Sequence, residues 1–316
     1  NALFPHLDVV FGIPCVQRES IGGTLDTFLD QRGWEMNELG FAVGVREDYG
    51  YQAEEYSNVD LPVDILDNDF RDPDLDRYLE RFKELDPSVG IIGDAYSRAE
   101  ARELNQVAET ILERDPFKQV VAVPKCRRAL DELCDDVVLG YAMGYSDVQA
   151  EDFSEIRDWR GRCVHLLGAS PPKQYEVIQD LTQPTLFNDQ PADIVGLDWN
   201  GLHGVALKGE YWSRNGWQSA DHLSVRETVR KSLQEIKQYW QERGIWPDTE
   251  PIELHGEAVE KPDEFVFMDR GGDPIPDRAA LEDAYVEQYS YDGGEVKWAF
   301  QSEAYKEFVE WREGVV

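Results

Sequence analysis

The most informative stretch of this 316-residue chain is Asp193-Ile194-Val195-Gly196-Leu197-Asp198-Trp199-Asn200-Gly201. An apolar run, residues 194–197, leads directly into an acid, Asp198. A continuous apolar run of this length is typical of a parallel strand that is buried on both faces. In barrels built from such strands, catalytic residues lie at the C-terminal strand ends. The stretch therefore predicts a buried strand that presents Asp198 at the functional end of its sheet.

The same pattern recurs along the chain and predicts the architecture. Between several of the apolar runs, amphipathic stretches at residues 74–85, 98–112 and 172–181 have the spacing of helices. Eight strand–helix units in roughly 200 residues predict a TIM (β/α)8 barrel. A doubly wound open sheet is the alternative, which the absence of a GxGxxG fingerprint disfavours. The eight predicted strands are residues 7–10, 41–45, 63–66, 89–92, 120–123, 137–139, 163–167 and 194–197.

The sequence changes character after the eighth run. Residues 202–219 are rich in Gly and Trp without a clear period, which predicts a long loop over the mouth of the barrel. Ser224, with Glu227 three residues later, forms a capping box that predicts a helix to about Arg243. We therefore expect a catalytic barrel domain over residues 1–245. Residues 246–316 are expected to form a small C-terminal α+β appendage packed on the barrel, with strands at 265–268 and 296–300 and a helix at 303–311.

Composition limits the environment and the partners. The chain has 64 acidic against 31 basic residues, a net charge of -33, which favours a halophilic protein of haloarchaeal or haloviral origin. In molar salt the Debye length is about 3 Å, so this acidity counts only weakly against a nucleic-acid partner. The four cysteines form no CxxC pair, so we expect no metal site. No apolar run reaches 18 residues and no signal peptide is evident, so we expect a cytoplasmic protein without membrane contact.

Three acids follow predicted strands, and they form the candidate site. Asp67 follows the third run, Asp94 the fourth and Asp198 the eighth. Each of them alone is adequately explained as a cap of the next helix or turn. Three acids at corresponding strand ends favour a shared site at the barrel mouth.

Other residues near the strand ends allow two interpretations each. Gly140 and Gly144 are either turn glycines or a backbone surface that a planar ring can approach closely. His165 lies within the seventh run and is more often a core histidine than a catalytic one. Tryptophans 199, 212 and 217 either pack a lid or offer stacking platforms for bases.

Several of these segments, in this order, resemble the tRNA-guanine transglycosylase superfamily, including its relatives that put 7-deazaguanines into DNA. The resemblance covers roughly residues 7–243 and rests on order and spacing. The family's zinc site is absent here, because the last cysteine, Cys163, precedes the eighth strand. The matching segments are Leu66-Asp67-Asn68-Asp69-Phe70 to the family's Asp-Ser-Gly-Gly-Phe, Gly140-Tyr141-Ala142-Met143-Gly144 to its Gly-Gly-Leu-Ala-type turn, and Val164-His165-Leu166-Leu167-Gly168-Ala169 to its strand-seven motif.

The resemblance implies a base exchange at an N-glycosidic bond. Asp198 falls at the position of the family's nucleophile, and Asp67 at that of its first catalytic acid. Asp94 matches the acid that reads the base edge, and Tyr141 or Met143 would form a wall of the base pocket. The implied substrate-binding residues are Asp94, Lys125, Gly140, Tyr141, Ala142, Met143, Gly168 and Asn200.

The implied partners are a nucleic acid, either DNA or tRNA, and a 7-deazaguanine base, with no cofactor. The exposed aromatics also allow a homodimer. Two alternatives stay open: another TIM-barrel hydrolase acting on a small ring or glycoside substrate, and a catalytically silent binding protein of the same fold.

Overall fold

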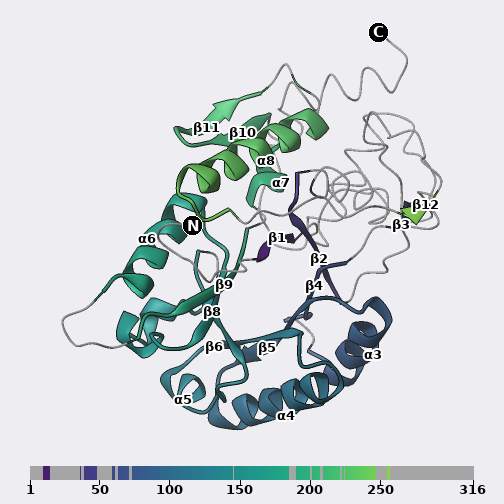
Figure 1. Ribbon diagram of the computed structural model, residues 1–316, viewed down its shortest axis with the longest axis vertical. Helices are drawn as coiled ribbons and strands as arrows, with labels where there is room; N and C mark the ends of the chain where they lie inside the picture. The colour runs from purple at the N-terminus through teal and green to yellow at the C-terminus, as the bar shows by residue number, and fades with distance from the viewer. Residues whose placement is uncertain are drawn as a thin grey trace, which may run out of the picture.

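Eight parallel strands form the central sheet of the computed structural model (Figure 1). They are hydrogen-bonded in chain order, and β1 pairs with β9 as well as with β2, so the sheet curls and closes on itself. The structure describes residues 10–14, 36, 39–47, 59–60, 63–70, 73–144, 146–184, 190–199, 201–206, 209–220, 223, 225–246 and 255–256. The strands are β1 (Val10–Pro14), β2 (Ala42–Arg46), β4 (Ile65–Asp67), β5 (Val89–Ala95), β6 (Gln119–Pro124), β7 (Val138–Ala142), β8 (Cys163–Leu167) and β9 (Asp193–Asp198).

The protein therefore has a mixed α/β fold with a curled parallel sheet, and each strand overlaps one of the eight predicted runs. The largest displacement is at β1, which begins at Val10, the last residue of its predicted run. The run is followed by Phe11-Gly12-Ile13-Pro14, which continues the strand although glycine and proline interrupt its apolar pattern.

The described helices lie on the outer side of the sheet and follow most of its strands from β4 onwards (Figure 1). Asp74 caps the helix after β4 by accepting the Arg77 N–H at 3.0 Å, and Ser97 caps the next helix through the Glu100 N–H at 3.3 Å. Two single 3₁₀ turns, η1 (Ala150–Asp152) and η2 (Ile156–Asp158), stand between β7 and β8. The helices are α3 (Leu75–Leu85), α4 (Arg98–Arg114), α5 (Arg127–Leu130), α6 (Pro171–Thr182), α7 (Gly201–Ala206) and α8 (Val225–Glu242).

The apolar residues form two separate layers. One cluster contains strand residues alone, among them Ile65, Ile91 and Val123, and it fills the interior of the curled sheet. A larger cluster contains helix residues together with the opposite faces of the strands, and it lies between the sheet and the helices. Which of these clusters a strand residue joins shows whether its side chain points inward or outward.

The segment after β9 is more regular than predicted. Residues 202–219 do not form one long loop, because they contain α7 and a hairpin of β10 (Glu210–Ser213) and β11 (Gly216–Ser219). Trp212 and Trp217 are paired across this hairpin, and aromatic cross-strand pairs of this kind stabilise hairpins. The predicted helix follows as α8, and its apolar stripe is buried as expected: Val229, Leu233, Ile236 and Trp240.

The predicted appendage lies almost entirely outside the described residues, including its expected strands at 265–268 and 296–300 and its helix at 303–311. One part is described: β12 (His255–Gly256) pairs antiparallel with β3 (Val59–Asp60).

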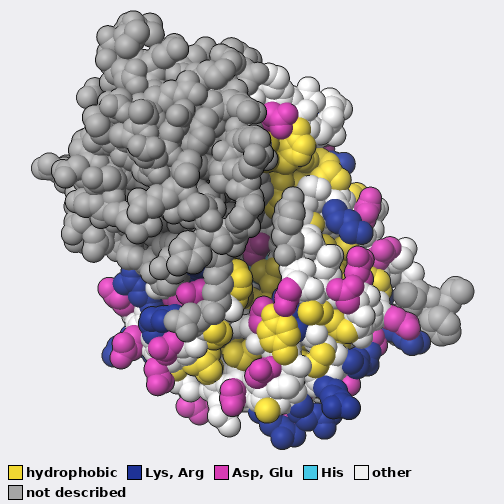
Figure 2. All heavy atoms as spheres, turned by 180° about the vertical axis from the view of Figure 1, so that it is seen from behind, with side chains coloured by type: hydrophobic (Ala, Val, Ile, Leu, Met, Phe, Trp, Pro, Cys, Tyr) yellow, Lys and Arg dark blue, Asp and Glu magenta, His cyan; other side chains and the backbone are white. Residues whose placement is uncertain are grey.

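No described helix has the length and apolarity needed to cross a membrane. On the face shown in Figure 2, acidic side chains spread over the described surface and basic ones gather towards its lower edge.

Candidate active site at the C-terminal ends of the strands

Two β-bulges turn acids into the interior of the curled sheet. In β5 the register shifts between Ile91 and Gly93, so that Ile92 packs outward and Asp94 comes level with the inward-facing Val123. In β9 a shift beside Val164 and His165 brings Asp198 level with Leu167, which packs against the inner cluster. Bulges insert one residue and so reverse the alternation of side chains beyond them. Both acids therefore face the interior at the C-terminal ends of the strands, an end called here the mouth.

Asp67 reaches the mouth without a bulge, since it lies two residues after the inward-facing Ile65. Its carboxyl pKa is raised well above the ordinary value, chiefly by burial, and further by the charges of Asp198 and Asp94. Arg46 and the backbone N–H of Asn68 act in the opposite direction. The three acids thus lie within electrostatic reach of one another, and Asp67 holds its proton to a higher pH than an exposed aspartate.

Asp198 is buried, and each of its carboxylate oxygens has a nitrogen within hydrogen-bond distance. The Gly168 N–H donates to Oδ1 at 3.1 Å, and His165 Nε2 lies 3.3 Å from Oδ2. Gly168 adopts a left-handed φ of 80°, and a Cβ there would lie 2.9 Å from the Met143 carbonyl oxygen. Only glycine readily allows this turn, which aims the N–H at the acid. A carboxylate whose two oxygens are held in this way is suited to act as a nucleophile.

Asp94 is tied to the β7–β8 connection through Lys125. The Lys125 ammonium lies 3.2 Å from Asp94 Oδ2 and 3.2 Å from Asp147 Oδ1, and donates to Ser146 Oγ at 2.6 Å. Tyr96 Oη also donates to Asp147, at 2.8 Å. An ammonium has three N–H donors, and these contacts occupy all of them. Lys125 therefore orients Asp94. Its predicted role in substrate binding would require a free donor, and these contacts leave none.

Burial raises the pKa of Asp94, and Lys125 partly offsets that effect. Among the described residues, Asp94 Oδ1 accepts no hydrogen bond, while Oδ2 faces Lys125 and Tyr96. One oxygen of this acid is therefore available to accept a hydrogen bond.

Two buried charged residues at the end of β2 escaped the sequence analysis. Arg46 is level with Asp67 in the sheet and buried, with its guanidinium 5.7 Å from the centre of the exposed Phe70 ring. Glu47 is also buried and accepts the Asp69 N–H at 2.9 Å. The sequence did contain one signal for Arg46. It lies two residues after Gly44, and residues two apart share one face of a strand. His165 was taken as a core residue, and its burial agrees with that, but it also contacts Asp198.

The two residues that were predicted to form a wall of the pocket do not face the interior of the sheet. Tyr141 points outward from β7 and packs on Trp159, with the ring centres 4.7 Å apart, in the layer between sheet and helices. Met143 also joins that outer layer. Alternation along the strand explains this, because Ala142 faces inward and its neighbours must face outward. Gly140 is not a turn glycine either: it lies within β7, where a Cβ would come within 2.8 Å of both Val123 and Leu167.

The other predicted positions fall at the mouth or outside the description. Ala142 faces the interior, and Gly168 contacts Asp198 as described above. Asn200 lies outside the described residues. Trp199, directly after β9, packs against Trp212 and Trp217 with ring centres 6.2 and 5.8 Å apart, so these rings form one aromatic cluster beside the mouth. In the described part of the chain, no three His, Cys, Asp or Glu side chains are arranged to hold a metal ion.

Comparison with known proteins places the sequence but gives it no activity. Residues 36–241 match a family described as "Family of unknown function (DUF6610)". No curated protein matches the sequence. Among solved structures, the crystal structure of the YdjI aldolase from Escherichia coli K12 aligns with 75% of this chain and 90% of its own, at 14% identity and a TM-score of 0.41.

Proposed function

The chain belongs to the DUF6610 family, whose function is unknown, and we propose that this member is a (β/α)8-barrel enzyme that exchanges a base at an N-glycosidic bond. One observation carries the proposal: two acids at the same mouth have opposite surroundings. Asp67 is desolvated and close to other acids, which raises its pKa, whereas each oxygen of Asp198 has a nitrogen within hydrogen-bond distance. A pair of carboxyls with distinct environments is how enzymes divide acid and nucleophile roles in glycosyl transfer.

The residues would act in sequence on a bound nucleoside unit. Asp198 Oδ attacks the anomeric carbon, forming a C–O bond as the C–N bond to the departing base breaks. Asp67 gives its proton to that base, which leaves as the neutral heterocycle. The incoming base returns a proton to Asp67 as its nitrogen attacks the anomeric carbon and expels Asp198. Two displacements at one carbon retain its configuration.

Asp94 supports recognition of a guanine-like base. Its open Oδ1 can accept a hydrogen bond from the donor edge of such a ring, while Lys125 fixes Oδ2. The Trp199 cluster lies beside the mouth, where ring stacking would hold neighbouring nucleotides. We propose a guanine in DNA or tRNA as the outgoing base, and a 7-deazaguanine as the incoming one. The target nucleotide would have to leave its stack to reach Asp198.

The test is incorporation of labelled guanine, preQ0 or preQ1 into tRNA and into DNA, in separate reactions at molar salt. The expected result is label in one polymer and a covalent protein–nucleic acid adduct that survives denaturation. Release of free base without incorporation would instead identify a hydrolase acting on a glycoside. Neither incorporation nor release, with folded protein, would refute the proposal and leave a binding protein of the same fold.

A further inference from the structure

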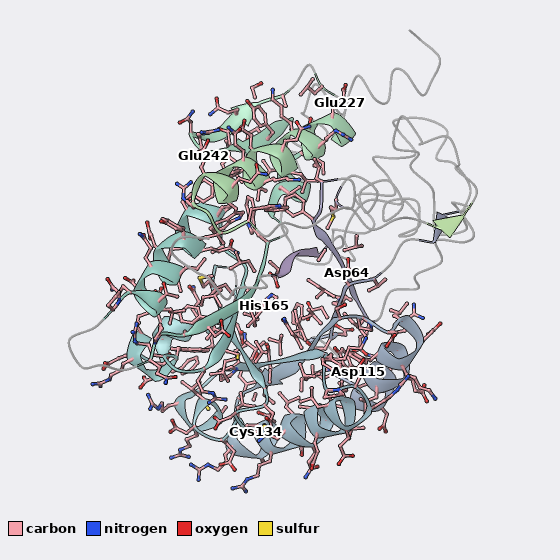
Figure 3. The ribbon with its side chains drawn as sticks, viewed as in Figure 1. Asp64, Asp115, Cys134, His165, Glu227 and Glu242 are labelled. Atoms are coloured by element: carbon pink, nitrogen blue, oxygen red, sulfur yellow. The ribbon has the colours of Figure 1, made fainter. Side chains whose placement is uncertain are left out.

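His165 lies where it can control the geometry of Asp198. It is fully buried on β8, on the inner side of the ring of strands (Figure 3). Its Nε2 lies 3.3 Å from Asp198 Oδ2, and it is level with Gly196 on β9. A histidine serving only to fill the interior would not need to direct a ring nitrogen at a carboxylate.

The neighbouring strands leave room for the imidazole. A Cβ at Gly196 would overlap the ring, with His165 Nδ1 the nearest atom. On the other side His165 is level with Gly140 of β7. The bulge that turns Asp198 inward lies at the same place, because the register shifts between Val164 and His165. The glycine, the bulge and the histidine thus form one local arrangement beneath the acid.

The two nitrogens of the ring have different surroundings, and this fixes the tautomer. Nε2 faces a carboxylate oxygen, which accepts a hydrogen bond when the acid is ionised. Nδ1 is buried and has no hydrogen-bond partner among the described residues. A proton on Nδ1 would leave a buried donor unsatisfied and would turn the Nε2 lone pair towards the negative oxygen. The favoured tautomer therefore carries its proton on Nε2.

Helix α6 also contributes to the hydrogen bonds around His165 and Asp198. The buried Gln174 of α6 donates through Nε2 to the main-chain carbonyls of Gly168, at 2.8 Å, and Asp198, at 2.7 Å. The turn that carries the Gly168 N–H is thereby locked to the end of β9. The Gly168 N–H in this turn donates to Asp198 Oδ1, and His165 on β8 is placed to hold Oδ2.

We propose that His165 is a positioning residue: its Nε2–H fixes the rotamer of the Asp198 carboxylate so that a lone pair points into the mouth. The catalytic consequence rests on the function proposed above, whereas the hydrogen bond and the tautomer do not. A ground-state clamp of this kind lowers the entropy that the nucleophile must lose on the way to attack.

A matched pair of substitutions separates positioning from packing. His165→Gln keeps an N–H donor at about the reach of Nε2, and His165→Leu keeps the volume without the donor. We expect H165L to lower kcat by about 100-fold with little change in KM, since one preorganised donor is lost. H165Q should stay within about tenfold of the wild type. H165L should unfold at a lower urea concentration than the wild type, since the buried Asp198 Oδ2 loses its hydrogen-bond partner, so kcat is compared on folded protein. Equal kcat for both variants, whether intact or lost, would overturn the proposal.

A second measurement does not depend on activity. Nitrogen-15 NMR of the labelled protein, with the His165 signal assigned by its loss in H165Q, should show a protonated Nε2 and an unprotonated Nδ1. Asp198→Ala should shift the Nε2 signal while the fold is retained. A proton on Nδ1, or an Nε2 signal that D198A leaves unchanged, would overturn the proposal. If the wild type exchanges no base but shows this tautomer and shift, the proposed function fails and the hydrogen bond stands.

Discussion

The ends of β4 and β9 both place an aspartate at the mouth, but the surroundings of the two side chains differ. At the β4 end, Asp67 is half-buried and flanked by two other acids, with Arg46 and one backbone N–H as its stabilising partners. At the β9 end, Asp198 is buried, yet a backbone N–H and an imidazole nitrogen face its two oxygens. Burial and the neighbouring acids raise the pKa of Asp67, whereas both oxygens of Asp198 have hydrogen-bond partners. The neighbours, and not the side chain itself, therefore assign the two acids to different tasks.

The largest effect is expected at the β9 end. Asp198→Asn should lower kcat at least about 1,000-fold, because an amide cannot form the glycosyl bond, and it should abolish the covalent adduct. Asp193→Asn is the matched control, since Asp193 lies at the opposite end of the same strand and is exposed. Base exchange and adduct formation measured for both variants test this. A substantial rate in D198N would show that Asp198 is not the nucleophile.

A smaller loss is expected at the β4 end. Asp67→Asn should lower kcat by about 100-fold or more, because the amide has no proton to give to the departing base. In the wild type, the rate should fall as pH rises through the raised pKa of Asp67, since the protonated form is the acid. Kinetics between pH 4 and 9 measure this.

The control for this variant lies on the same segment. Asp64, labelled in Figure 3, precedes β4 at its N-terminal end and accepts the Val43 N–H at 2.8 Å. Asp64→Asn should leave the pH–rate profile unchanged. A profile for D67N that keeps the alkaline fall of the wild type would assign the acid role to another residue.

Lys125 is expected to have an intermediate effect, confined to binding. Lys125→Met removes the ammonium that links Asp94 to Asp147 and Ser146, so Asp94 should lose its fixed orientation. KM for the base should rise about tenfold, while kcat changes little. Lys173→Met, an exposed lysine in the first turn of α6, is the control and should match the wild type. A fall in kcat with KM unchanged would place Lys125 in the chemical step instead.

The smallest expected effect is on the free energy of unfolding, for which the two acids should differ in sign. An aspartate with a raised native pKa binds its proton more tightly when folded, so stability decreases as pH rises from the ordinary carboxyl pKa to the raised one. Asp67→Asn removes that cost and should stabilise the protein at pH 7 by on the order of 1 kcal/mol, less so near pH 4. Asp198→Asn should instead destabilise it by about 1 kcal/mol, because a carboxylate that accepts from two donors is lost.

Urea unfolding at pH 4 and pH 7 measures both effects. The two variants should shift the midpoint in opposite directions at pH 7. Shifts in the same direction would show that the surroundings of Asp67 and Asp198 differ less than their contacts indicate.

Much of the architecture was predictable because apolar runs report burial directly. All eight runs became strands of one sheet, and the apolar faces of α4 and α8 were buried as their spacing predicted. Part of the site followed as well: Asp67, Asp94 and Asp198 stand together because C-terminal ends of parallel strands share an edge. The base exchange and the halophilic character remain predictions.

Side-chain direction was the part that could not be predicted. Tyr141 and Met143 were expected in the pocket, but alternation around Ala142 turns both outward. Asp94 and Asp198 face inward only because a bulge precedes each of them. Uninterrupted alternation from Ile91 or Val195 would have turned either acid away from the mouth. Bulges arise from pairing with a neighbouring strand, which leaves no pattern within the strand itself.

The sequence by itself determined the strands, the flanking helices and the acids at the strand ends, since these depend on local hydrophobic periodicity. Tertiary structure alone decided that β1 pairs with β9, a contact between segments more than 180 residues apart in the printed sequence. It also placed His165 beneath Asp198, and Arg46 beside Asp67. Proton affinity depends on solvent exclusion and on charges from other strands. For that reason the contrast between Asp67 and Asp198 exists only in the folded chain.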